Sequence, residues 1–143
     1  MQEIRLPSKT DILNWDNESV VLRVMKELKM NRAQAKQWFT DFMCWLYSAQ
    51  RWRIEKQKSF MMDSMNYLDE VWHAYILHTR DYLAMSKELF GIECVHHNPE
   101  NPFKGEPMDP EAFEQQLLFL MDDWGEEYID RVWAYGNDVA EAI

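Results

Sequence analysis

A stripe of large apolar side chains between residues 35 and 52 restricts the fold more than any other pattern in the chain. Its members recur at the spacing of one face of an α-helix. They are Ala35, Trp38, Phe39, Phe42, Trp45, Leu46, Ala49 and Trp52. So many large rings on one face have to be buried against other elements, so we predict that this segment is the central core helix. Met43, Cys44 and Tyr47 widen the apolar arc, and core packing therefore explains the stripe better than a cofactor pocket does.

Helix ends can be recognised before the core helix. Asp16 or Asn17 can cap a first helix, which should stop near Lys29, and Asn31 can cap the core helix itself. The residues before this first helix, 1–16, show no helical pattern and are predicted to be irregular.

Further helices are expected after the core helix. Either one long helix, or two joined by a kink, runs to Leu89, and Gly91 suits its end. The proline-rich stretch 92–110 should form a loop. Asp109 and the residues after it are typical of a helix start, with aspartate as cap and proline in the first position.

Gly125 should end that helix, and a final short helix should reach Gly136. The predicted fold class is therefore all-α. We expect a compact bundle of about five helices, with the proline-rich loop between the fourth and fifth elements, in a single helical domain over residues 1–143.

Composition supports a folded chain in a reducing compartment. The 143 residues are 47% apolar and include 7 Trp, 7 Phe and 6 Tyr, whereas disordered chains are poor in aromatic residues. Cys44 and Cys94 are the two cysteines, too few for a disulfide framework. The N-terminal stretch shows no secretory h-region and no apolar run approaches membrane-spanning length. We expect a cytoplasmic protein without a membrane segment.

Negative charge is concentrated at one end of the chain. Residues 105–143 hold eleven of the 25 acids and one of the 15 bases, Arg131, and so account for the whole net charge of −10. Direct nucleic-acid binding through a basic face is disfavoured. Two interpretations stay open: a solvated acidic surface that keeps the protein soluble, and a surface that attracts a basic protein partner.

The basic cluster of the chain lies at the end of the core helix. Its members are Arg51, Arg53, Lys56 and Lys58. Cations there can complement the helix macrodipole, can bind nucleic acid beside Trp52, or can meet the acidic C-terminal segment within the same molecule.

The residues that could carry chemistry lie between positions 68 and 99, which contain all four histidines. Asp69 and His73 are four residues apart, so on a helix the carboxylate can orient the imidazole. His78 lies about 140° further round the helix and cannot join them. His96 and His97 can return from the following loop, so Asp69, His73, His96 and His97 would be candidate ligands for Zn²⁺ or Fe²⁺.

The run L-D-E-V-W-H-x-x-I-L-x-T-R-x-Y over residues 68–82, followed by F-G and H-H-x-P, resembles the signature of bacterial proteins similar to the glycine-rich domain-containing protein family. Tyr75 stands where that pattern has a second histidine, and Ser86 stands where it often has a cysteine. The resemblance implies a small all-helical domain whose polar residues share one site. It does not imply a reaction.

Two classes of function follow. The first is a metal- or small-molecule-binding domain, with the metal ligands above and with binding residues Trp72, Tyr75, Arg80 and Tyr82. The second is an acidic, non-catalytic interaction or inhibitor protein, including a nucleic-acid mimic, that binds a basic partner. A polar cluster that merely docks the 92–103 loop onto the helix is the structural alternative to the first class. No P-loop, dinucleotide fingerprint, nucleophile elbow or H-E-x-x-H motif favours an enzyme.

Overall fold

The computed structural model describes residues 3–57, 66–95 and 110–132, and in these ranges it contains helices and no strand. Six helices have defined bounds: α1 (Lys9–Asn14), α2 (Glu18–Leu28), α3 (Arg32–Lys56), α4 (Asn66–Leu77), α5 (Thr79–Phe90) and α6 (Pro110–Trp124). Residues 126–132 are also helical. The all-α class is confirmed, but the prediction of about five helices was too low, because the described part already contains seven.

The additional helix at the start, α1, lies where irregular chain was expected. Ser8 caps it, since the backbone N–H of Asp11 donates to Ser8 Oγ at 3.0 Å. A single turn and a half with one buried apolar residue, Ile12, is too short to show helical periodicity. The capping serine was the available signal.

The caps predicted for the next two helices are confirmed. Asn17 accepts from the N–H of Val20, and Asn31 accepts from the N–H of Gln34. Lys29 adopts a left-handed conformation at the end of α2, close to the expected end of the first helix.

Of the two alternatives for the following segment, the structure has two helices joined by a kink. The break is at His78, which has φ −90° and ψ 65° and lies between α4 and α5. Gly91 ends α5 with φ 68°, and Gly125 follows α6 with φ 89°. Both glycines take the positive φ that a helix end of this kind requires.

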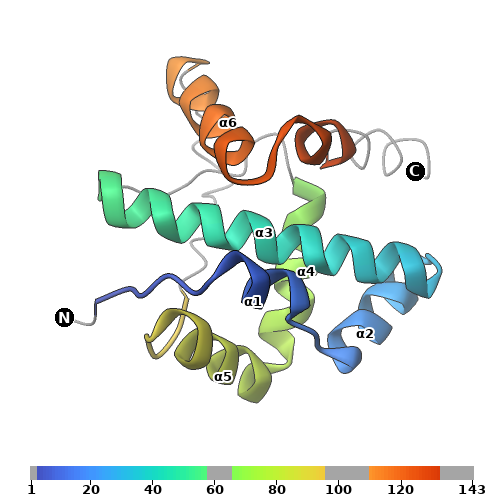
Figure 1. The fold of residues 1–143 in the computed structure, drawn as a ribbon. Helices are drawn as coiled ribbons and strands as arrows, with labels where there is room; N and C mark the ends of the chain where they lie inside the picture. The colour runs from blue at the N-terminus through green and yellow to red at the C-terminus, as the bar shows by residue number, and fades with distance from the viewer. Residues whose placement is uncertain (1–2, 58–65, 96–109, 133–143) are drawn as a thin grey trace, which may run out of the picture.

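The core helix α3 lies at the centre of the fold (Figure 1). It packs against α1, α2, α4 and α6, and α4 crosses behind it in this view. All ten residues from 41 to 50 are buried, which is possible only for a helix covered all round. The predicted central position of this helix is confirmed.

One hydrophobic cluster runs through these layers, from Ile12 of α1 to Val132 near the end of the described chain. The predicted loop between α5 and α6 begins in the described residues 91–95, which are not helical. The rest of it, 96–109, lies outside the described residues, as do the expected cap Asp109 and the helix end near Gly136. None of the described helices is long and apolar enough to cross a membrane.

Candidate functional site

The predicted carboxylate–imidazole pair forms on the surface of α4. Oδ2 of Asp69 lies 3.2 Å from Nε2 of His73. The His73 side chain is half exposed and that of Asp69 is less so. The pair is thus open to solvent and has the geometry to hold the ring in one orientation.

The metal site as a whole is not brought together by the described residues. Among them, no group of three His, Cys, Asp or Glu side chains could hold a metal ion. His96 and His97, the other two predicted ligands, lie outside the described residues. His78, which was not predicted to join the pair, bonds another helix: its Nε2 accepts a hydrogen bond from Arg23 Nε at 3.0 Å.

Two of the predicted binding residues, Trp72 and Tyr82, are buried and bonded to each other. The Trp72 indole N–H donates to the Tyr82 hydroxyl at 2.8 Å, and that hydroxyl donates to the backbone carbonyl of Val95. The Ser86 hydroxyl donates to the Tyr82 carbonyl and accepts from the Val95 N–H, both at 3.0 Å. Burial raises the pKa of the Tyr82 phenol, which favours the protonated form that donates to Val95.

This buried chain of bonds holds the segment after α5 onto the helix. It matches the structural alternative for residues 92–95, the part of the predicted loop that the structure describes. Ser86 was noticed in the sequence only as a departure from the resembled pattern. Its hydroxyl is completely buried and anchors Val95, so its role depends on which backbone groups lie beside it.

The other two predicted binding residues, Tyr75 and Arg80, differ in burial. Tyr75 is completely buried; its hydroxyl accepts from the Trp15 indole N–H at 3.0 Å, and its ring packs on Tyr82 with centroids 5.5 Å apart. Burial raises the pKa of Tyr75 to about 12. Arg80 is exposed in the first turn of α5. Trp72, Tyr75 and Tyr82 belong to the hydrophobic core.

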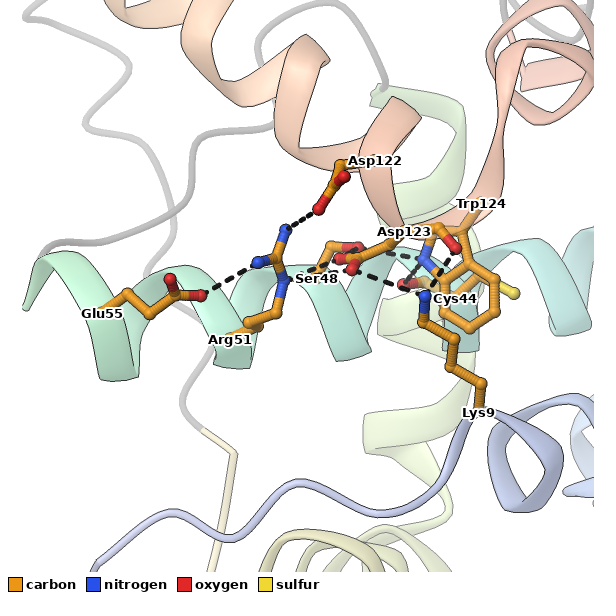
Figure 2. A network of polar contacts seen from close by, with 8 residues as sticks. All are labelled: Lys9, Cys44, Ser48, Arg51, Glu55, Asp122, Asp123 and Trp124. Carbon is orange, nitrogen blue, oxygen red and sulfur yellow. Dashed lines mark hydrogen bonds and ion pairs between the residues drawn. The ribbon is translucent and has the colours of Figure 1, made fainter.

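A second polar network joins the predicted basic cluster to the acidic segment (Figure 2). Arg51 of α3 points toward α6, where its Nε lies 3.1 Å from the Asp123 carboxylate and its Nη2 lies 3.4 Å from Asp122. Ser48 donates to Asp123 at 2.7 Å, and Lys9 of α1 donates to the Asp123 backbone carbonyl at 2.9 Å. The interpretation that the basic cluster meets the acidic segment is confirmed for Arg51.

Apolar and aromatic contacts reinforce the same junction. The Arg51 guanidinium lies 3.6 Å from the centre of the Phe119 ring. The Trp124 indole N–H lies 2.9 Å from both the Cys44 carbonyl and the Ser48 hydroxyl. Cys44 itself is buried, and burial raises the pKa of its thiol, so it behaves as the inert small hydrophobe that its place in the stripe predicted.

The one base of the C-terminal segment, Arg131, bonds a buried acid of α3, although its own side chain is 40% exposed. Arg131 makes two hydrogen bonds to the carboxylate of Asp41, Nε at 3.0 Å and Nη2 at 2.8 Å. Asp41 is completely buried in α3, and the Tyr128 hydroxyl donates to its backbone carbonyl. The sequence gives no signal for this pair, because Asp41 and Arg131 are ninety residues apart.

The other acids that the structure describes between residues 110 and 132 are exposed. We call α6 and residues 126–132 together the C-terminal unit, and its exposed carboxylates the acidic face. These are Glu111, Glu114, Asp122, Glu126, Glu127 and Asp130. Arg131 is the only base of the C-terminal unit, and its charge is paired with Asp41 of α3. The negative charge of the exposed carboxylates is therefore not balanced by a base within the unit.

A family model described as UCP032817-like matches residues 18–130. The chain belongs to this family. The range that defines the UCP032817-like match contains both the Asp69–His73 pair and every carboxylate of the acidic face, and it leaves α1 outside. The match gives no support to the glycine-rich domain name suggested by the motif. No curated protein and no solved structure matches the chain.

Proposed function

We propose that this UCP032817-like domain is an interaction module whose acidic face binds a basic segment of a partner protein. The observation that carries the proposal is the separation of charge within the C-terminal unit. Its base and its least exposed acid are used to dock the unit on α3, while six carboxylates are left on the surface.

The physical consequence is a surface on which negative charge predominates. Such a surface steers oppositely charged partners and raises their association rate. Interactions between exposed charges are screened over about 8 Å at physiological ionic strength. Binding through the acidic face should therefore weaken steeply with salt. A partner that normally binds nucleic acid is included, because the face would then act as a mimic of nucleic-acid charge.

The first test reverses the charge of exposed carboxylates and leaves unchanged the residues that hold the C-terminal unit on α3. The variant Glu114→Lys/Glu126→Lys/Glu127→Lys changes three exposed carboxylates of the acidic face. We expect it to lose most of the affinity for a fluorescent lysine- and arginine-rich peptide, measured by anisotropy at low and at physiological salt.

The matched control is Glu3→Lys/Glu70→Lys/Glu88→Lys, which makes the same charge change at exposed positions elsewhere. It should retain nearly all of the affinity. Equal losses in the two variants would mean that the peptide senses only net charge, and the proposal would fail.

A metal site at the Asp69–His73 pair is the second candidate function. The favouring observation is that Val95, the residue before His96, is tethered through Tyr82 to Trp72, the neighbour of His73. We propose that His96 or His97 completes a site for Zn²⁺ or Fe²⁺ with Asp69 and His73. A carboxylate and two or three imidazoles are a suitable ligand set for either ion.

Thermal unfolding with and without added metal tests this candidate. Free metal at about 100 times its dissociation constant should add roughly 2.7 kcal/mol of stability, a rise in Tm of about 5–10 °C for a domain near this size. His73→Ala should abolish the rise, whereas His78→Ala should keep it because His78 bonds Arg23 instead. Protein that carries no metal and shows no rise with either ion would exclude the site.

A further inference from the structure

The outward surface of α6 contains apolar side chains among its acids. Leu118 is 56% exposed and Met121 is 40% exposed. Both lie on the same side of the helix as Glu114 and Asp122, which are also exposed. Neither solubility nor the attraction of cations requires exposed apolar side chains on this surface.

Leu118 lies at the centre of this surface. It is four residues after Glu114 and four before Asp122, so the three side chains form one row along the helix. Leu120, two residues on and so about 200° round the helix, is buried. Leu118 therefore points away from α3, with a carboxylate in the turn before it and another in the turn after it.

Isolated exposed leucines are common and by themselves indicate nothing. Leu22 of α2 and Leu77 of α4 are about as exposed as Leu118, and they lie on helices that do not belong to the C-terminal unit. What distinguishes Leu118 and Met121 is their place inside the acidic face, where charge complementarity restricts the kind of partner that can cover them.

We infer that the basic segment bound by the acidic face is an amphipathic helix, with an apolar side packed on Leu118 and Met121 and with lysine or arginine residues flanking that side. This inference rests on the proposed function and specifies its partner. Helix-on-helix docking uses apolar anchors spaced three and four residues apart. The exposed row from Glu111 to Asp122 is about 16 Å long, which suits a partner helix of about three turns.

Two synthetic peptides of identical composition test the inference. In one, leucines recur at helical spacing with lysines on both flanks; in the other, the same residues are shuffled so that no apolar side forms. We expect the amphipathic peptide to bind at least about tenfold tighter, a difference of about 1.4 kcal/mol. Leu118→Ser/Met121→Ser should remove that advantage and leave the affinity of the shuffled peptide unchanged.

The control variant Leu22→Ser/Leu77→Ser removes two equally exposed leucines outside the acidic face and should keep the tenfold preference. Circular dichroism of each variant confirms that the helices remain. Equal affinity for the two peptides, with salt-sensitive binding that still needs Glu114, Glu126 and Glu127, would overturn the amphipathic helix and leave the acidic module standing. Failure of both peptides to bind would overturn the module itself.

Discussion

Asp122 and Asp123 are neighbours on α6, yet their carboxylates have opposite environments. The Asp123 side chain is 4% exposed and bonds Ser48 and Arg51, whereas the Asp122 side chain is 76% exposed. A helix turns by about 100° per residue, so one of two adjacent acids can face the partner helix while the other faces water. The two residues contribute equally to the net charge of the chain, but only Asp123 is buried against α3.

Replacing each by alanine should separate the two roles. Asp123→Ala leaves the Nε–H of Arg51 and the buried Ser48 hydroxyl without their acceptor, and should lower the free energy of unfolding by about 2–4 kcal/mol. Asp122→Ala removes an exposed, long contact and should cost less than about 1 kcal/mol. Urea denaturation of the two variants measures the difference. Similar costs would show that the C-terminal unit does not dock through Asp123.

Among the elements, α3 is the one on which the others depend. It is buried all round between residues 41 and 50, and it supplies Asp41, Ser48 and Arg51 to the polar contacts that hold the C-terminal unit. The apolar stripe packs on α4, where the Trp45 and Trp72 rings have centroids 5.2 Å apart.

The central position of α3 predicts a large loss of stability when one of its buried side chains is truncated. Trp45 is 1% exposed, so Trp45→Ala should lower the free energy of unfolding by about 3–5 kcal/mol. Ile54 near the end of the same helix is 43% exposed, and Ile54→Ala should cost less than about 1 kcal/mol. Chemical denaturation compares the two. A small loss at Trp45 would contradict the central position of α3.

At the scale of the whole molecule, the burial of two phenols and a thiol in the core links stability to pH. Burial raises the pKa of Tyr75 to about 12 and also raises the pKa values of Tyr82 and Cys44 above their ordinary ranges. In the unfolded chain a tyrosine loses its proton near pH 10 and a thiol near about 8.5. Above those values the unfolded state binds fewer protons than the folded state, so stability falls as pH rises.

We therefore expect the urea midpoint to fall between about pH 8.5 and 12, with Tyr75 contributing about 1.4 kcal/mol per pH unit above 10. Tyr75→Phe should make that fall less steep, whatever its effect at neutral pH. A midpoint independent of pH over this range would show that the three groups titrate as freely in the folded state as in the unfolded one.

Local patterns in the sequence were enough to predict the helical class, the central helix, the cap Asn31 and the helix ends at Gly91 and Gly125, and they narrowed the first cap to Asp16 or Asn17. Each depends on residues within a few positions of one another, through helical periodicity or through a backbone conformation that glycine permits. The same reasoning found Asp69 and His73, because a spacing of four on a helix brings side chains together without help from the rest of the fold.

Only the tertiary structure decided what those helices expose. Trp72, Tyr75 and Tyr82 share their segment with His73, yet they belong to the core, because α3 and the 91–95 segment cover that side of α4 and α5. Arg131 pairs with Asp41 and Asp123 with Ser48 across long stretches of chain. Such pairings depend on which helix faces meet after packing, and the spacing of residues along the sequence does not say which faces will meet.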